Sequence, residues 1–401
     1  MSNKVPQIRF NGYSDAWEQR KSSAIFHTIT DFVANGSFAS LRENVSYSDK
    51  LDYAIVVRLT DYSNGYKGPF LYTSKSGYDF LKKSSLNPND ILISNVGANA
   101  GLVFKAPILD VPMTLGPNSI LVRTSDQDHE FMYQLMRSTT GEHLIKTQIG
   151  ISAQPKFNKT EFKQIIFTIP KSQEEQQKIG NLFHELDHTI ALHQRRLDLL
   201  KEQKKGYLQK MFPKNGEKVP ELRFAGFADD WEERKLSDIA DRFDNLRVPI
   251  TASDRKSGDT PYYGANGIQD YVEGFTHDGE FILVAEDGAN DLKNYPVQYV
   301  NGKVWVNNHA HVLQGKKTIT DNKFLMNSIK NFNIEPFLVG GGRAKLNADV
   351  MMKLNVLLPT FEEQEKIGSF FKQLDDTITL HQRKLDLLKE QKKGFLQKMF
   401  V

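Results

Sequence analysis

Two long stretches of the chain, residues 22–169 and 236–358, place amide, guanidinium and ammonium side chains beside glycines in loop-like segments. Amides and guanidinium groups can bond base edges, cations can contact phosphates, and glycines let a backbone approach a ligand closely. The residues with these properties are Arg42, Tyr66, Lys67, Lys75, Asn95, Asn99, Gln154 and Lys156 in the first stretch and Arg247, Arg255, Lys256, Tyr263, Asn266, Asn290, Asn307, Asn308, Arg343 and Lys345 in the second. As a set they predict nucleic-acid contacts, although each one alone could be a solvated side chain or a turn residue.

Catalytic patterns are weak by comparison. Asp278, Glu286 and Asp287 come nearest to a metal-dependent nuclease, but Gly288 stands where a lysine would be expected. The glycines before Arg343 neither follow a Rossmann strand nor carry the lysine and hydroxyl of a P-loop, so they predict a loop that presents Arg343. No amino-methyltransferase motif is found either. The sequence therefore predicts no catalytic residue and no metal site.

An internal repeat must position the two stretches. Residues 174–212 return as residues 362–400, with about 30 of about 39 positions identical. A shorter lead-in, residues 5–21, also returns as residues 219–235, and each copy contains a proline and a tryptophan. The chain is interpreted as a tandem duplication in which shared frames carry unlike inserts.

The repeated block predicts a long helix with an apolar seam. In both copies the seam residues alternate steps of four and three, which is the heptad spacing of a coiled coil. They are Ile179, Phe183, Leu186, Ile190, His193, Leu197 and Leu200, continuing through Lys204, Tyr207 and Met211, and Ile367, Phe371, Leu374, Ile378, His381, Leu385 and Leu388, continuing through Lys392, Phe395 and Met399. A rod on the order of 58 Å needs a partner, and we expect the copies to pair antiparallel about a pseudo-twofold axis.

Polar residues interrupt the seam at matching places. Antiparallel pairing would bring His193 and His381 together, either to fix the register or, alternatively, to serve a metal or catalytic site. Lys204 and Lys392 are expected to pack their stems and extend their ammonium groups into water.

Both helices share a start signal. Ser172 is followed by Glu175, and Thr360 by Glu363, which is the spacing of a capping box. In such a box the hydroxyl and the carboxylate satisfy the first free backbone N–H groups of the helix.

The two inserts have the pattern of mixed α/β domains. The expected strands are residues 53–59, 90–94 and 119–123 in the first insert, before a helix near 130–137, and residues 280–284, 303–306 and 311–313 in the second. The tripeptide Gly-Ala-Asn follows an apolar run at residues 97–99 and again at residues 288–290. The inserts are therefore expected to share one fold with different surfaces.

The predicted fold class is α+β, with two mixed α/β domains separated by two long α-helices in an antiparallel coiled coil with pseudo-twofold symmetry. The expected boundaries are residues 1–170 for the first domain with its lead-in, 171–212 for the first helix, 213–359 for the second domain with its lead-in, and 360–401 for the second helix.

Composition sets broad limits on function. The length of 401 residues suits two or three domains, and a net charge of +3 leans basic too weakly to indicate nucleic acid alone. The absence of cysteine excludes disulfides, thiolate metal sites and a cysteine nucleophile. Because the sequence also lacks a signal peptide and a long apolar run, it predicts a cytoplasmic protein with no membrane association.

The repeated motifs carry a family resemblance. The Val-Pro-x-x-Arg-Phe lead-in with its tryptophan, the Pro and Glu-Glu-Gln-x-Lys-Ile-Gly helix start, and the Leu-Asp-Leu-Leu-Lys-Glu-Gln-Lys-Lys-Gly run resemble the DNA specificity subunit of type I restriction-modification systems. The resemblance covers essentially the whole chain, although in the inserts it rests on organisation alone.

The resemblance implies that each insert is a target-recognition domain reading one half of a bipartite, asymmetric site on double-stranded DNA. The helix pair would set the unread gap and dock two methyltransferase subunits and two restriction subunits that translocate and cut DNA. In that family the specificity subunit is not an enzyme and has no cofactor, whereas the partner subunits use S-adenosylmethionine, ATP and Mg²⁺.

Other functions remain open at this stage. The chain could be a self-contained nuclease or methyltransferase, or a coiled-coil scaffold that binds only proteins. It could also serve a methylation-only system, or one that combines cutting and methylation in its partners.

Overall fold

The computed structural model describes residues 5–150, 155–214, 216–340 and 344–401. The chain divides into two compact units, one made of Met1–Leu192 with Leu385–Val401 and the other of His193–Lys384. These units do not follow the four predicted segments, because each takes part of both long helices.

The two long helices are α8 (Gln173–Lys210) and α12 (Phe361–Lys398), and each has 38 residues. In the first unit, Phe183 of α8 packs against Phe400, just after α12, with ring centroids 5.6 Å apart. In the second unit, Tyr207 of α8 packs against Phe370 of α12 at 5.0 Å. The start of one helix lies beside the end of the other in each unit, which confirms the antiparallel pairing.

The helix seam is buried as the heptad spacing requires. Ile179 and Phe183 in the first unit and Ile367 and Phe371 in the second are each at most 2% exposed. In the second unit His193 and His381 meet, with their Nδ1 atoms 3.1 Å apart. One ring must donate and the other accept at this distance, so the pair fixes the register of the helices there.

The first predicted capping box forms only in part: the N–H of Glu175 donates to Ser172 Oγ at 3.3 Å. Glu175 does not complete a capping box, because Arg9 of the lead-in binds both of its carboxylate oxygens, at 2.6 and 2.8 Å. Arg223 binds Glu363 in the same way, at 2.7 and 2.8 Å. A bidentate, charge-assisted pair is stronger than a bond to one backbone N–H, and it ties each lead-in to the start of its helix.

The seam lysines do not extend into water. Lys392 pairs with Asp187 in the first unit, and Lys204 pairs with Asp375 in the second, each at 2.5 Å. Lys392 is only 8% exposed, and burial lowers its pKa despite the nearby carboxylate. A lysine buried this deeply needs a carboxylate partner, and the other copy of the repeat supplies it.

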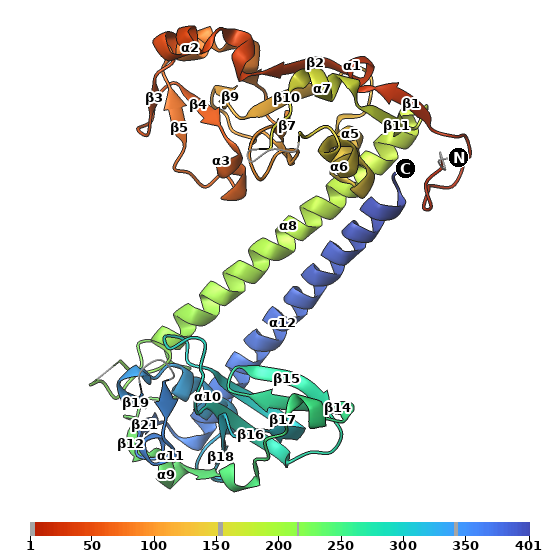
Figure 1. Cartoon of the computed structure of the whole chain (residues 1–401). Coiled ribbons are helices and arrows are strands. Elements are labelled where there is room, and N and C mark those ends of the chain that lie inside the picture. Colours follow the sequence, from red (N-terminus) through yellow and green to blue (C-terminus); the bar gives the residue numbers. More distant parts are fainter. Residues whose placement is uncertain (1–4, 151–154, 215, 341–343) are drawn as a thin grey trace. The chain divides into compact units, whose positions relative to one another are not determined.

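The first unit contains two larger sheets around separate cores (Figure 1). One is antiparallel in the order β2-β10-β7-β8, and the other has the order β3-β5-β4-β9-β6 with a parallel β4–β9 pair. The strands are β1 (Glu18–Lys21), β2 (Phe26–Asp31), β3 (Tyr47–Ser48), β4 (Ala54–Val57), β5 (Leu71–Thr73), β6 (Ser85–Leu86), β7 (Ile91–Ser94), β8 (Val103–Lys105), β9 (Met113–Leu115), β10 (Ser119–Thr124) and β11 (Ile166–Ile169). The helices before α8 are α1 (Ser22–Ile25), α2 (Phe38–Asn44), α3 (Leu59–Ser63), α4 (Lys75–Phe80), α5 (His129–Arg137), α6 (Thr139–Lys146) and α7 (Lys159–Gln164).

The second unit is built on one six-stranded sheet in the order β13-β18-β16-β17-β14-β15 (Figure 1). The strands are β12 (Glu232–Lys235), β13 (Ala240–Arg242), β14 (Ser257–Gly264), β15 (Gly267–Val272), β16 (His277–Ala285), β17 (Val297–Val306), β18 (Ala310–Gly315), β19 (Leu338–Val339), β20 (Lys345–Leu346) and β21 (Asn355–Leu358). The helices between α8 and α12 are α9 (Leu236–Ile239), α10 (Asn322–Lys330) and α11 (Ala348–Met351).

The two units share a frame, as the sequence predicted. The lead-in strands β1 and β12 pair antiparallel with β11 and β21, and β2-β10-β7 corresponds to β13-β18-β16. Asp128 caps α5 and Asp321 caps α10 in the same manner. Trp17 packs on Phe131 of α5, at 5.9 Å between ring centroids, and Trp231 on Phe324 of α10 likewise, at 5.6 Å.

Most predicted strands lie within observed ones, but the strand expected at 53–59 is too long, because α3 begins at Leu59.

The units differ in what is added to this frame. The first adds the five-stranded sheet of β3, β4, β5, β6 and β9, whereas the second extends its main sheet with β14, β15 and β17. No described helix has the length and apolarity needed to cross a membrane.

Candidate nucleic-acid interface

The loop that follows β16 in the second unit, residues 286–290, gathers several of the predicted site residues. We call it the second-unit loop. Its backbone is held at Glu286, whose N–H donates to His309 at 2.9 Å and whose carbonyl accepts from Leu346 at 2.7 Å. The side chain of Asn266 donates to Gly288 O and accepts from Asn290 N, both at 2.9 Å. These bonds fix the loop, so Asn266 has a structural role that its loop position concealed.

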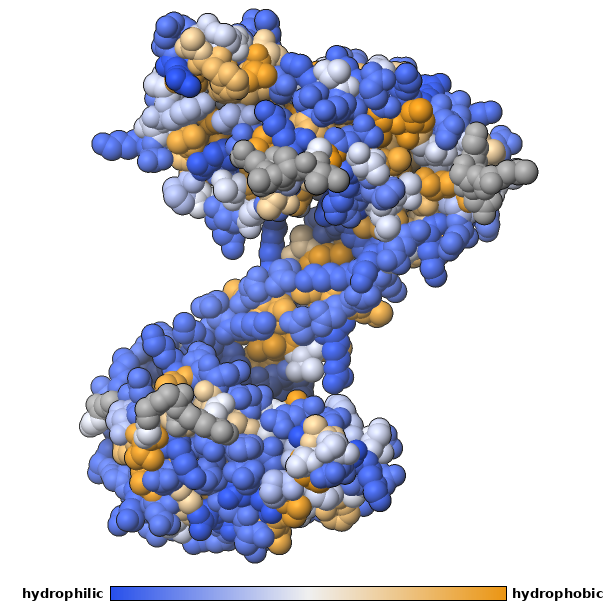
Figure 2. Space-filling view, in the orientation of Figure 1, coloured by the Kyte–Doolittle hydropathy of each residue, from blue (hydrophilic) through white to orange (hydrophobic). Residues whose placement is uncertain are grey.

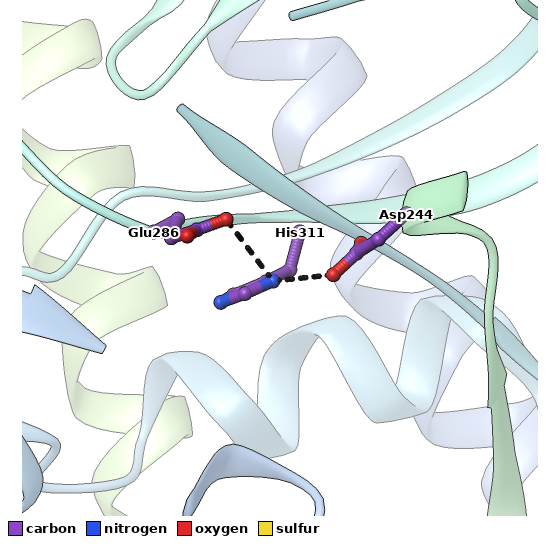
Figure 3. A group of neighbouring side chains, drawn as sticks. All are labelled: Asp244, Glu286 and His311. Atoms are coloured by element: carbon purple, nitrogen blue, oxygen red, sulfur yellow. Dashed lines mark hydrogen bonds and ion pairs between the residues drawn. The ribbon is translucent and has the colours of Figure 1, made fainter. Parts of the chain in front are cut away.

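A charged cluster lies beside the second-unit loop and contains Asp244, Glu286 and His311 (Figure 3). His311 Nδ1 lies 2.7 Å from Asp244 Oδ2 and 3.6 Å from Glu286 Oε2. Glu286 also binds Arg247 Nη1 at 2.7 Å and Lys345 Nζ at 2.8 Å. Two predicted site residues, Arg247 and Lys345, are thus brought together on one carboxylate.

The electrostatics of this cluster favour ionised carboxylates. Burial alone would raise the pKa of Glu286, but the hydrogen bonds from Lys345 and Arg247 outweigh burial and lower it. Burial alone would also raise the pKa of Asp244, but hydrogen bonds from His311 and the amide of Val312 outweigh burial and lower it. The cluster is a network of ion pairs that holds the second-unit loop at Glu286.

The same three side chains could be considered as metal ligands, because their candidate ligand atoms lie within 4.8 Å of one another. Their partners argue against a metal. Both nitrogens of His311 are already engaged, since Nδ1 lies 2.7 Å from Asp244 Oδ2 and Nε2 lies 2.8 Å from Leu346 O. Both oxygens of Glu286 already bind cations. We therefore interpret the cluster as structural.

The nuclease-like grouping suggested by the sequence is not assembled. Asp278 lies near the start of β16 and Glu286 just beyond its end. Eight residues of extended strand separate them by about 25 Å. Asp287 instead contacts His309, with Oδ1 and Nδ1 2.6 Å apart.

The first unit has a matching loop, residues 95–99, after β7. We call it the first-unit loop. Phe157 N donates to Asn95 O at 3.1 Å, as Leu346 N does to Glu286 O. An isolated bridge joins Val96 to Lys156, as another joins Asp287 to Lys345. The faint Gly-Ala-Asn match in the sequence therefore marks equivalent loops in the two units.

Predicted site residues in the first unit fall into two groups. Asn95 is buried, and the hydroxyl of Tyr66 donates to the carbonyl of Lys105 while burial raises the Tyr66 pKa, so both are structural. The exposed residues are Arg42, Lys67, Lys75, Asn99 and Lys156. Lys75 forms an ion pair with Asp79 at 2.9 Å. Gln154 lies outside the described residues.

The second unit divides in a similar way. Asn307 is buried, and Tyr263 packs against the core of β16, β17 and β18. Arg255 lies over the ring of Tyr262, at 4.3 Å from its centroid. The exposed residues are Lys256, Asn266, Asn290 and Asn308. Arg343 lies outside the described residues.

Sequence reasoning missed one candidate residue. Arg137 ends α5 and lies near the first-unit loop, where it lines the same cavity as Asn99. Its position inside a predicted helix, rather than in a loop, gave no signal. Only the packing of α5 beside the loop brings it to this surface.

Comparison with known proteins connects these features to one family. The sequence model described as the type I restriction modification DNA specificity domain matches residues 17–202 and 228–390. A putative type I restriction enzyme specificity subunit of Haemophilus influenzae is 44% identical over 154 residues, which make up 38% of this chain and 39% of that protein. A putative specificity subunit of Methanocaldococcus jannaschii is 22% identical and is matched over 95% of this chain and 92% of its own length.

A solved structure has the same fold. The S subunit of a type I restriction-modification system from M. genitalium superposes with a TM-score of 0.70 over 99% of both chains, at 16% sequence identity.

Proposed function

The chain belongs to the type I restriction modification DNA specificity family, and we propose from this that it gives a restriction-modification complex its DNA sequence specificity. The observation that carries the proposal is the pair of equivalent loops at residues 95–99 and 286–290. The same frame occurs in each unit and holds one loop, yet the side chains and added strands around the two loops differ. Two readers of different sequences need this combination.

Each unit would read one half of a bipartite, asymmetric site on double-stranded DNA, using the loop after its central strand. Exposed Asn99 and Lys156 in the first unit, and Asn290 and Asn308 in the second, have the chemistry for base edges and phosphates. Arg247 and Glu286 would hold the second-unit loop and would not read bases themselves. The unread gap would be set by the paired helices.

The helices would also dock the partner subunits. Leu192 and Leu199 of α8 are about half exposed, and the repeat-equivalent residues Leu380 and Leu387 of α12 are 67% and 52% exposed. The two leucines on each helix are seven residues apart and share one of its faces, away from the buried seam. Hydrophobic surface is visible along the helices in Figure 2. Matched apolar positions on two copies of one helix suit two copies of one partner.

The proposed partners are two methyltransferase subunits and two restriction subunits. The chemistry would reside in those subunits, which would bind S-adenosylmethionine, ATP and Mg²⁺, and this chain would be a recognition subunit without catalysis. A role as a protein-binding scaffold is the competing function. It predicts assembly with partners but no change in which DNA is modified.

The direct test is to co-express the chain with a cognate methyltransferase subunit and map N6-methyladenine in a genome that lacks other such systems. We expect one bipartite motif with a fixed gap. An assembled complex that leaves DNA unmethylated, or that methylates a continuous motif, would contradict the two-reader proposal. Cutting or methyl transfer by the purified chain alone, supplied with Mg²⁺, ATP and S-adenosylmethionine, would contradict the absence of catalysis.

A further inference from the structure

A cavity of about 320 Å³ opens beside the first-unit loop. Its walls include Ala98 and Asn99 of that loop, Arg137 at the end of α5, and Glu142 and Lys146 of α6. Lys146 pairs with Glu142 at 2.6 Å, so these two charges largely compensate each other. Among the residues that line the cavity, Arg137 therefore carries the uncompensated charge, and the carboxylate of Asp187 also acts on it.

Arg137 is held in place but only partly satisfied. Its Nη1 donates to the hydroxyl of Tyr133 at 2.9 Å, and its guanidinium lies 5.0 Å from the centroid of the same ring. Tyr133 is buried, so it fixes the direction of the guanidinium. Within residues 5–150, 155–214, 216–340 and 344–401, no carboxylate forms an ion pair with Arg137. A guanidinium has five N–H donors, so several remain for a ligand.

The first-unit loop lines the same cavity with Ala98 and Asn99. Gly97 and Gly101 flank its turn with φ values of 83° and 87°. Among the described residues, no acceptor bonds the backbone N–H of Ala98 or Asn99. The second unit differs here, because the N–H of Asn290, the counterpart of Asn99, is taken by the side chain of Asn266. In the part of the chain that the structure describes, no side chain of the first unit takes the place that Asn266 has in the second.

We propose that this cavity binds a backbone phosphate of the DNA, with the Arg137 guanidinium as its main ligand and the first-unit loop as its second wall. The proposal rests on the proposed function. Guanidinium groups bind phosphate oxygens in a bidentate manner, and successive backbone N–H groups add an anion-binding concavity. A phosphate held here would set the register of the first unit on the duplex without reading sequence.

The test uses the full chain assembled with its methyltransferase subunits. It measures, at several salt concentrations, the affinity of this complex for a duplex that contains the motif the complex methylates. Arg137→Gln should make the negative slope of log K against log salt shallower by about 0.9. This change corresponds to about an eight-fold loss of affinity near 0.1 M salt. Arg137→Lys should keep most of the slope, because the charge remains. Glu142→Gln should act in the opposite direction and tighten binding several-fold, which loss of a merely structural side chain would not do.

Two controls separate the outcomes. Lys163→Gln removes an exposed charge of the same unit away from the cavity and should leave the slope unchanged. Thermal unfolding of each variant shows whether it folds. If the unaltered complex binds DNA and Arg137→Gln keeps its slope, the phosphate subsite is wrong and the function stands.

A second readout distinguishes DNA from a free anion. If the unaltered complex does not bind DNA, both proposals are wrong. If inorganic phosphate at millimolar concentration raises the unfolding temperature of the unaltered chain and not of the Arg137→Gln variant, while the salt slopes agree, the ligand is a free anion. That result would overturn the assignment to DNA.

Discussion

Glu286 is the side chain on which the second-unit loop most depends. It belongs to the loop, and its carboxylate gathers Arg247, Lys345 and, at a longer distance, His311. Removing a partner from such a network leaves partly buried charges without compensation, which costs more than the net gain from forming the network.

Glu286→Gln should therefore destabilise the second unit by about 2 kcal/mol at neutral pH. The lowered pKa of Glu286 means that its contribution is fully present above the usual value of 4.5 and is lost as the pH falls through the lowered value in the folded protein. The difference between variant and unaltered chain should shrink as the pH falls below 4.5 and should vanish once the pH lies below the lowered pKa. Urea unfolding at several pH values, followed by tryptophan fluorescence, measures it.

The matched control for this prediction is Asp278→Asn, which removes an exposed carboxylate from β16, the strand that precedes Glu286. It should change the free energy of unfolding by less than about 0.5 kcal/mol. A loss equal to that of Glu286→Gln would mean that the general charge balance, and not the ion-pair network, stabilises the loop.

The partners of individual side chains were the part of the structure that the sequence predicted least well. Arg247 and Asn266 were chosen for their chemistry, but both bind the protein itself. Their partners lie 39 and 22 residues away in the chain and arrive through the pairing of β16, β17 and β18. No local spacing encodes such contacts, so a side chain suited to DNA and one committed to the fold look alike in the sequence.

At the scale of elements, the long helices were the most predictable part. A heptad repeat depends on spacing alone, and the duplication showed the same spacing twice, so the helix, its seam and the meeting of His193 and His381 followed from the sequence. The carboxylate halves of the capping boxes are missing because Glu175 and Glu363 have partners in the lead-ins, which local spacing cannot reveal.

The buried ion pair of the first unit should fix how its two helix segments align. Asp187→Ala leaves the ammonium of Lys392 buried without its carboxylate and should cost about 3 kcal/mol of unfolding free energy. Replacing both residues by leucine should recover most of that loss, because a packed apolar pair needs no charge compensation. Asp375→Ala should behave alike in the second unit.

Chemical denaturation of the single and double variants measures the coupling between the two positions. Asp198→Ala, at an exposed site of α8, is the control and should have little effect. If the double leucine variant were no more stable than Asp187→Ala, packing and not charge compensation would be the limiting factor.

The exposed leucines of the helices separate docking from folding. Leu197 is 1% exposed and Leu199 is 49% exposed, although both lie on α8. Leu197→Asp should unfold the seam, with a loss of about 4 kcal/mol, and should abolish methylation at all sites. Leu199→Asp should leave unfolding unchanged within about 0.5 kcal/mol and weaken capture of the methyltransferase subunit. Normal capture by a folded Leu199→Asp chain would contradict the docking surface.

At the scale of the whole molecule, the shared frame suggests that the inserts are interchangeable. The lead-in strands β1 and β12 present the same register to β11 and β21, with Lys21 opposite Ile166 and Lys235 opposite Asn355. Phe131 meets Phe400 in the first unit, and Phe324 meets Phe212 in the second, so equivalent aromatic contacts join each insert to the helices. An insert from either unit brings the residues that the other frame needs.

We expect a chain in which residues 22–169 replace residues 236–358 to fold and to direct methylation to a symmetric motif. Both halves should be copies of the half read by the first unit, in inverted orientation, as the pseudo-twofold axis expected from the duplication would require. The reciprocal chain, with residues 236–358 in both places, is the matched control and should give the other symmetric motif. Methylation mapping reads out both. A folded, active chimera that kept the original asymmetric motif would place sequence readout outside the inserts, in the lead-ins or the helices that both halves share.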